Sequence, residues 1–176
     1  LQQNEFKALY PDQKPKPKEL VLDTDVEVFF PTDYINNVKE RMVQYQALST
    51  LKTEDELRAF EDALKDRFGS LPEPTLALFE SVRFKWLGTS LGFEKIVLKQ
   101  NKLIGYFISD QNSLFYQSDR FSKVLKYVQS NPKLCSVKEK QMRQGLRLLM
   151  SFPNVSSVQD GLKALNPILD ISLKKS

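Results

Sequence analysis

The spacing of apolar residues changes near Gly92, and this change limits the fold more than any other feature of the sequence. Before Gly92, apolar residues recur three and four positions apart, which is typical of amphipathic helices. After it, short runs that favour strands flank a turn signal, Gln100-Asn101. Because strands joined by a tight turn pair antiparallel, the sequence predicts an α+β fold rather than a doubly wound parallel sheet.

The helical half opens with a predicted strand over Val26–Phe30, which Pro31 ends because proline has no amide hydrogen for a sheet ladder. Thr32 or Asp33 is then expected to cap the first helix. The spacing of its apolar residues predicts one buried face. That face consists of Ile35, Val38, Met42, Tyr45 and Leu48.

The second helix has a start and a stop signal. Thr53-Glu54-Asp55-Glu56 is a capping box, in which the Thr53 hydroxyl accepts a hydrogen bond from the amide of Glu56 and the Glu56 carboxylate reaches back. Three acidic residues in the first turn also suit the positive end of the helix dipole. Gly69 fits the C-terminal cap, a position that favours glycine.

The third helix is predicted to begin at Pro72 and Pro74, since proline is tolerated in the first turn of a helix, and to end at Gly92. Gly88 lies inside it, where glycine costs about 1 kcal/mol relative to alanine. We therefore expect a close packing contact at Gly88.

The half after Gly92 is predicted to contain two strand pairs and two helices. Strands are expected over 94–99, 102–109, 134–137 and 146–152, and helices from Ser118 to Asn131 and over 156–165, the last ended by Asn166-Pro167. Together with the helical half, these elements predict one compact domain over 21–169. It lies between a Lys/Pro-rich linker at 1–20 and a frayed tail at 170–176.

Prolines alternate with lysines between Pro11 and Lys18. Proline fixes the backbone and like charges repel, so this stretch is expected to be extended and solvated. It is interpreted as a linker or tether, and a proline-rich docking peptide is the alternative.

The residue types needed for catalysis are scarce. The chain has no histidine, one cysteine (Cys135), and six single glycines without a Gly-Lys-Ser/Thr motif. Catalytic triads, zinc sites and phosphate-binding loops of the common kinds are therefore excluded. We expect no catalytic residue, metal or cofactor in this segment, which is predicted not to be an enzyme on its own.

Two further features indicate the compartment. A single cysteine permits no internal disulfide and is typical of a reducing cytosol, which predicts a cytoplasmic protein. No apolar stretch approaches the roughly 20 residues that a membrane helix needs, so no membrane association is expected.

Charge is distributed unevenly along the chain. Residues 19–80 hold 14 acidic and 6 basic residues, whereas residues 81–176 hold 16 basic and 6 acidic residues. Such asymmetry often marks surfaces for partners. The alternative is that both halves are solvated faces that attract each other.

The segment from Val26 to Phe107 carries an ordered set of motifs. It reads Val-Glu-Val-Phe-Phe-Pro-Thr-Asp-Tyr-Ile from Val26, Lys-Thr-Glu-Asp-Glu-Leu from Lys52, Asp-Arg-Phe-Gly-Ser-Leu-Pro-Glu-Pro from Asp66, and Leu-Gly-Phe-Glu-Lys-Ile from Leu91. In this order and spacing the motifs resemble the C-terminal domain of bacterial transcription-repair coupling factors. Phe30 and Phe93 stand where that family often has aliphatic residues, and both remain apolar.

The resemblance implies a regulatory domain of a larger DNA translocase that displaces stalled RNA polymerase and recruits excision repair. In that family the ATP-binding motor lies upstream, and RNA polymerase and DNA contact other domains. The C-terminal domain would clamp the N-terminal UvrB-like module of the same protein and mask the surface that binds UvrA. Such an autoinhibitory contact acts at high effective concentration.

If this contact is electrostatic, the acidic half offers its partner-binding residues. The candidates are Glu54, Asp55, Glu61, Asp62 and Asp66, with Arg67 as either an exposed recognition residue or a turn-stabilising one.

The alternative hypothesis is a nucleic-acid-binding module that uses the basic half, since phosphates attract lysine and arginine. The candidates are Lys123, Lys126, Lys133, Lys138, Lys140, Arg143 and Arg147, with Phe115, Tyr116 and Tyr127 available for stacking.

Overall fold

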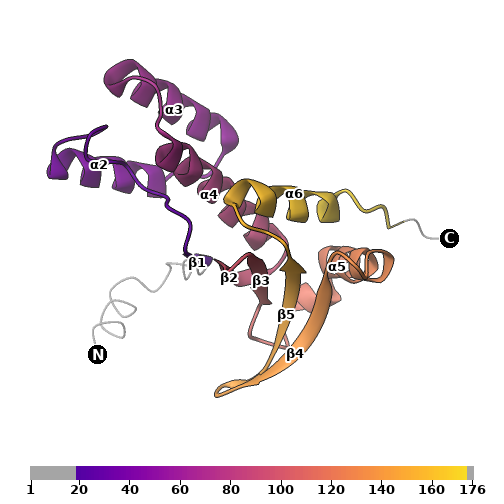
Figure 1. Ribbon diagram of the computed structural model, residues 1–176. Helices are drawn as coiled ribbons and strands as arrows, with labels where there is room; N and C mark the ends of the chain where they lie inside the picture. Colours follow the sequence, from indigo (N-terminus) through magenta and orange to yellow (C-terminus); the bar gives the residue numbers. More distant parts are fainter. Residues whose placement is uncertain (1–18, 174–176) are drawn as a thin grey trace, which may run out of the picture.

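The computed structural model describes residues 19–173, so residues 1–18 of the predicted linker (1–20) and the last three residues of the predicted tail lie outside the described residues. The domain begins at least one residue earlier than predicted, because Leu20 is buried in the core of the sheet. The described chain folds into a helical unit beside a sheet (Figure 1). The elements are β1 (Val21–Thr24), α2 (Val38–Ser49), α3 (Glu54–Phe68), α4 (Glu73–Ser90), β2 (Phe93–Lys99), β3 (Lys102–Phe107), the 3₁₀ helix η1 (Leu114–Gln117), α5 (Asp119–Ser130), β4 (Ser136–Met142), β5 (Gly145–Pro153) and α6 (Val158–Leu169).

The strands form one mixed sheet in the order β1-β2-β3-β5-β4. β2–β3 and β4–β5 are antiparallel hairpins, and β3 also pairs antiparallel with β5. Gln100 and Asn101 both adopt positive φ, as a two-residue hairpin turn requires. The predicted α+β class is confirmed. The parallel pairing of β1 with β2 was not predicted from the sequence.

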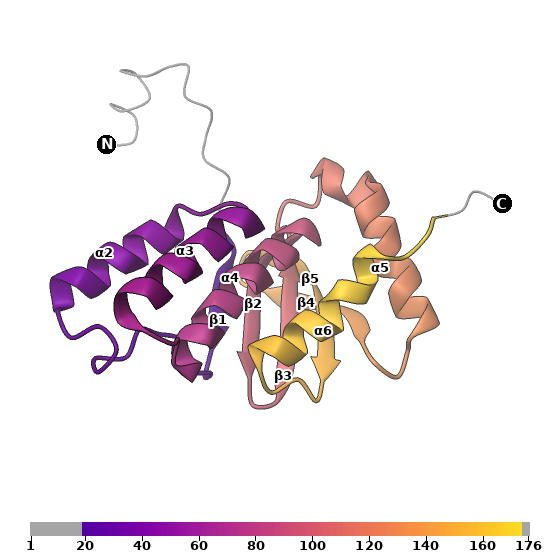
Figure 2. The same cartoon turned by 90° about the horizontal axis from the view of Figure 1, so that it is seen from above.

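Helices α4, α5 and α6 pack on one face of the sheet (Figure 2). Alternate residues of β2 and β3, such as Ile96, Leu98 and Leu103, are buried in this core. Phe84 of α4 and Leu165 of α6 are also fully buried there. A Cβ on Gly88 would lie 2.7 Å from the end of Ile96, which confirms the expected close packing at this glycine.

A second core lies within the helical unit formed by α2, α3 and the N-terminal part of α4. Leu57 and Leu64 project from α3 onto Phe79 of α4, and all three are almost fully buried. The predicted capping box begins α3: the amide of Glu56 donates to the Thr53 hydroxyl, and the Glu56 carboxylate accepts from the amide of Lys52.

The predicted strand over Val26–Phe30 is wrong, because this segment joins the two cores and its backbone bonds to helices instead. The amide of Phe29 donates to the carbonyl of Pro74, and the Thr75 hydroxyl donates to the carbonyl of Phe29. The amide of Phe30 donates to the Tyr45 hydroxyl at 2.8 Å. Phe30 is thereby inserted between α2 and α4, where only 2% of it is exposed.

The first helix begins later than predicted, at Val38 with Asn37 as its cap. Residues before it form a turn in which the amide of Ile35 donates to the carbonyl of Pro31. The predicted buried face is therefore only partly correct. Leu48 is buried, but Val38 and Met42 are 63% and 54% exposed because they point away from α3 and α4.

Two elements near the C-terminus also differ from prediction. The strand expected over 134–137 is the longer strand β4, which pairing with β5 extends to Met142. The last helix continues through Pro167 to Leu169. Proline lies in its final turn, where it removes only one hydrogen bond, and the continuation buries Ile168 completely. Beyond it, Ile171 packs partly against the same core.

Two glycines with similar backbone φ provide a test of this packing. A Cβ added to Gly69 (φ +90°) would have no atom within 4 Å, whereas a Cβ added to Gly92 (φ +89°) would clash with the ring of Phe115. Gly69→Ala should cost about 1–3 kcal/mol of unfolding free energy through backbone strain alone. Gly92→Ala should cost roughly 1–3 kcal/mol more because the ring must move. Urea denaturation measures both, and equal losses would contradict the close approach of Phe115.

Candidate interaction surfaces

Three of the predicted acidic residues form one exposed row on α3, which we call the acidic row: Asp55, Asp62 and Asp66. They are seven and four positions apart, so they share one face of the helix. Leu57 and Leu64 lie on the opposite, buried face. None of the three carboxylates forms an ion pair with any residue in 19–173.

The other three predicted partner-binding residues are held by ion pairs within the domain. Glu54 is 2.8 Å from the guanidinium of Arg83 on α4, Glu61 is 3.2 Å from Lys65, and Arg67 is 2.6 Å from Glu40 on α2. Arg67 also lies over the ring of Phe68. Glu54 and Arg67 therefore fasten α3 to its two neighbouring helices, which leaves the acidic row as the free part of the predicted surface.

The contact between Glu54 and Arg83 has an electrostatic consequence. Arg83 Nε donates to both carboxylate oxygens of Glu54, at 3.0 and 2.9 Å. This hydrogen bond lowers the pKa of Glu54 from its ordinary value, against the opposing effect of partial burial. Glu54 is therefore firmly ionised at neutral pH, and its charge is neutralised by Arg83 and Arg58.

Several of the predicted nucleic-acid-binding residues also have internal partners. Lys123 and Lys126 donate to the carbonyls of Leu169 and Ser172, where they hold the end of α6. Arg147 donates to the carbonyl of Phe107 and pairs with Glu94 at 3.0 Å. These three side chains therefore stabilise the fold through contacts within the domain.

The remaining predicted cations are exposed. Lys138 and Lys140 lie on strand β4, Arg143 lies in the turn between β4 and β5, and Lys133 follows α5 on another side of the domain. The aromatic residues predicted to stack are not free: Tyr127 is buried, and Phe115 and Tyr116 pack against Phe121. The predicted basic set thus does not form one surface.

Sequence reasoning missed four residues on the face of the sheet that the helices do not cover. Lys95, Lys99, Lys102 and Tyr106 share that face with Lys138 and Lys140. Lys95 and Lys99 are four positions apart and therefore share one face of a strand, but only the register joins that face to β4.

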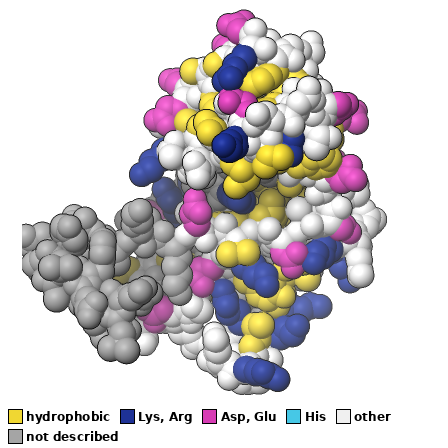
Figure 3. All heavy atoms as spheres, turned by 90° about the vertical axis from the view of Figure 1, so that its left-hand side faces the viewer, with side chains coloured by type: hydrophobic (Ala, Val, Ile, Leu, Met, Phe, Trp, Pro, Cys, Tyr) yellow, Lys and Arg dark blue, Asp and Glu magenta, His cyan; other side chains and the backbone are white. Residues whose placement is uncertain are grey.

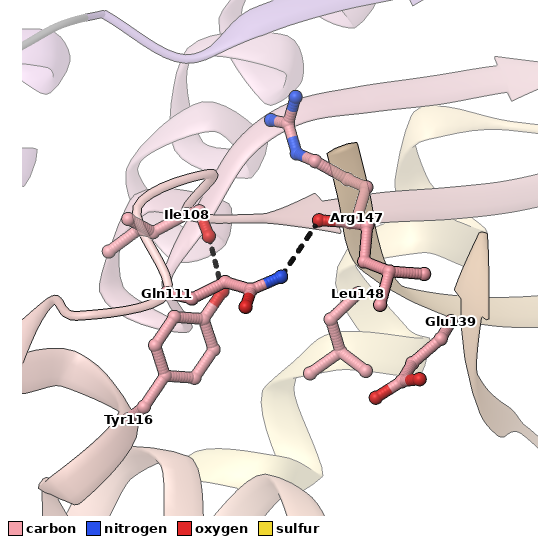
Figure 4. A pocket seen from close by; sticks show the side chains of 7 residues that line it. Ile108, Gln111, Tyr116, Glu139, Arg147 and Leu148 are labelled. Carbon is pink, nitrogen blue, oxygen red and sulfur yellow. Dashed lines mark hydrogen bonds between the residues drawn. The ribbon is translucent and has the colours of Figure 1, made fainter. Parts of the chain in front are cut away.

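A small pocket of about 210 Å³ lies between the segment before α5 and the β4–β5 hairpin (Figure 4). In it the Tyr116 hydroxyl donates to the carbonyl of Ile108, and Gln111 Nε2 donates to the carbonyl of Leu146 at 3.1 Å. Burial raises the pKa of Tyr116, so its hydroxyl stays protonated at neutral pH. The pocket offers hydrogen bonds and one carboxylate, Glu139, but no activated nucleophile.

The one thiol of the chain is not activated either. Cys135 is buried, and desolvation raises the pKa of its thiol, which disfavours the reactive thiolate. Among residues 19–173 no three His, Cys, Asp or Glu side chains gather closely enough to bind a metal ion. Within the same range, every helix is too short or too polar to traverse a bilayer.

Comparison with known proteins places this fold. The crystal structure of a C-terminal domain of transcription-repair coupling factor superposes with a TM-score of 0.64 at 14% identity, covering 92% of this chain and all of that chain. The protein is therefore an α+β domain with the fold of that C-terminal domain. At this identity the likeness speaks for the fold alone.

Sequence relatives supply the family. The TRCF domain family model matches residues 24–118, more than half of the chain. The transcription-repair-coupling factor of Escherichia coli (strain K12) is 33% identical over 101 residues, which cover 54% of this chain and 9% of that protein. That of Rickettsia bellii is 30% identical over 108 residues, covering 61% of this chain and 9% of that protein. The chain belongs to the TRCF domain family, and it spans about a tenth of the length of these relatives.

The ion pair of Glu54 predicts a pH-dependent contribution to stability. Because folding lowers the pKa of Glu54, its ionised form stabilises the domain fully at pH values above the ordinary glutamate pKa. This stabilisation is lost as the pH falls through the lower pKa that Glu54 has in the folded state. Glu54→Gln should lower the unfolding free energy at neutral pH by about 0.2–1 kcal/mol, as expected for a partly exposed pair. Urea denaturation at neutral and acidic pH measures the difference, which should disappear in acid.

The matched control is Asp62→Asn on the same helix, which removes a charge without an ion-pair partner among the described residues. It should leave stability at neutral pH unchanged or slightly raised. Equal losses for the two variants would show that the pair with Arg83 is not the cause.

Proposed function

We propose that this domain is a regulatory interaction module of a transcription-repair coupling factor. In this proposal the acidic row docks on a basic surface of the N-terminal UvrB-like module of the same protein and competes there with UvrA. ATP binding and the contacts with RNA polymerase and DNA belong to other parts of the parent protein. The proposal rests on the family, on the resemblance described above and on the arrangement of charges along α3.

The observation that carries the proposal is the division of the acidic residues of α3. Glu54 and Glu61 have cationic neighbours, whereas Asp55, Asp62 and Asp66 face solvent on one side of the helix. Like charges four positions apart destabilise a helix by about 0.2–0.5 kcal/mol per pair. Asp62 and Asp66 therefore carry a cost within the isolated domain that a basic partner surface would offset.

A hollow near the C-terminal end of α3 offers some apolar surface for affinity. It has a volume of about 530 Å³ and lies between α2 and the end of α3, and Val43, Arg67 and Phe68 are among its lining residues. Val43 is 53% exposed, although it is a β-branched apolar residue. Charge mainly steers association and sets its orientation, while desolvated apolar contacts supply most of the binding free energy.

A weak contact is sufficient for a module tethered to its target. An intramolecular partner acts at an effective concentration in the millimolar range when the connection is flexible. Even a low-affinity interface would then mask the UvrA-binding surface most of the time. A change elsewhere in the parent protein that disfavours the closed arrangement would release it by shifting the populations.

Charge reversal in the acidic row tests the proposal. Asp62→Lys with Asp66→Lys should weaken binding of this chain to the isolated N-terminal module by at least about tenfold at low salt, because two attractive contacts become repulsive. Isothermal titration calorimetry, with and without UvrA as competitor, measures the effect. The variant should remain folded, since it exchanges one like-charge pair for another at exposed positions and places cations in the C-terminal half of α3.

The control variant is Glu27→Lys with Glu139→Lys, which changes the net charge equally at two exposed sites away from α3. It should bind the module as the unchanged chain does. If reversal of the acidic row leaves the affinity unchanged, or if both variants weaken binding equally, docking through α3 is wrong.

A further inference from the structure

The sheet has one face buried under helices and one face that no helix among residues 19–173 covers. Ile96, Leu98 and Leu103 point into the core with α4 and α6. Their neighbours along the strands point the opposite way, and Lys95, Lys99 and Lys102 are exposed there. We call this second side the open face.

Register aligns the residues of the open face in rows across the strands. One row runs Lys95, Tyr106, Leu149 and Lys138, on β2, β3, β5 and β4 in turn. The pairs Arg147–Lys140 and Lys99–Lys102 form the rows on either side of the centre. Opposed residues of an antiparallel pair share one face, so these side chains belong to a single surface.

The open face is strongly basic. Its cations are Lys95, Lys99, Lys102, Lys138, Lys140 and Arg147. Lys99 pairs with Asp23 at 2.7 Å and Arg147 pairs with Glu94, so two of the six are neutralised. The other four lysines form no ion pair with any residue in 19–173.

The centre of the open face is apolar and contains an aromatic ring. Val97, Ile104 and Tyr106 are partly exposed there. The guanidinium of Arg147 lies 5.8 Å from the centre of the Tyr106 ring, which places a second planar group beside it. In Figure 3, several Lys and Arg side chains lie beside hydrophobic ones on the lower part of the molecule.

We propose that the open face binds single-stranded DNA. Lysines on both sides of an apolar, aromatic centre match a polyanion whose bases are unstacked, since phosphates contact the cations while a base stacks on the ring. A duplex keeps its bases stacked and would leave Tyr106 and Ile104 without a partner. A peptide of aspartate and glutamate has no aromatic rings to stack on Tyr106.

The dimensions also suit a short strand. Alternate residues along a strand are about 6.8 Å apart, so the rows from Lys99–Lys102 to Arg147–Lys140 extend over roughly 20 Å. With four free lysines as phosphate contacts, the logarithm of affinity should fall against the logarithm of salt concentration with a slope of about −3. The site belongs at the short end of the about 4–16 nucleotides seen for single-strand sites.

The test measures binding of the 176-residue chain to a fluorescent oligothymidylate of about 12 nucleotides by anisotropy over a range of salt concentrations. Binding at low salt is expected. Lys138→Gln with Lys140→Gln should weaken it about tenfold and reduce the size of the salt slope by about 1.4, the share of two phosphate contacts. Tyr106→Ala should weaken it roughly tenfold, and Tyr106→Phe should retain it.

The matched control is Lys133→Gln with Lys163→Gln, which removes two exposed lysines that are not on the open face. It should change the affinity of the chain less than about twofold, whereas loss of a stacking or phosphate contact should change it roughly tenfold. Circular dichroism and thermal unfolding of each variant exclude loss of the fold as the cause.

Two outcomes of the lysine experiments would overturn the assignment: no binding at about 50 mM salt, or equal losses for the Lys138/Lys140 variant and its control. Equal affinity of Tyr106→Ala and Tyr106→Phe would overturn it as well. So would a DNA duplex, an RNA of corresponding length or polyglutamate that binds as tightly as the single strand. Because the acidic row lies on α3 and not on the sheet, reversal of Asp62 and Asp66 should not weaken binding to single-stranded DNA. This result separates the proposal from that for the N-terminal module.

Discussion

Helix α4 takes part in both hydrophobic cores, and the arrangement of the rest of the domain depends on it. Phe79, in its N-terminal half, is buried with α2 and α3, whereas Phe84 is buried against the sheet and α6. A helix that is apolar on several sides must be covered on several sides. Gly88 lets the sheet approach the helix backbone, with Ile96 and Leu20 in close contact. The helical unit and the sheet are thus positioned relative to each other through one shared helix.

The same helix also determines which charges remain available at the surface. Arg83 projects from α4 and binds Glu54, while Glu40 on α2 binds Arg67 at the other end of α3. These pairs, together with the burial of Leu57 and Leu64, set the rotation of α3 about its axis. The acidic row consequently faces solvent. Each pair is individually weak because it is partly exposed, so orientation comes from packing and the ion pairs add to it.

Two surfaces of opposite charge result, one on the helical unit and one on the sheet. The acidic row lies within the residues that match the TRCF domain family, and so do Lys95, Lys102 and Tyr106 of the open face. Strand β4, with Lys138 and Lys140, lies outside that match. Opposite charges on separate surfaces would steer the domain toward two chemically different partners, because the field near each surface favours ligands of one sign.

The sequence by itself determined the α+β class and the elements with local signals. Thr53 and Glu56, the Gln100-Asn101 turn and the Ser118 cap act within a few residues, so their chemistry can be read from the chain alone. Val26–Phe30 has the composition of a strand but packs along α2 and α4, because Phe30 fills the core that these helices share. Only the tertiary structure decided which acids of α3 are free and which lysines share the open face. Lys95 and Lys138 are far apart in sequence, and their alignment depends on the register of four strands, which no local pattern specifies.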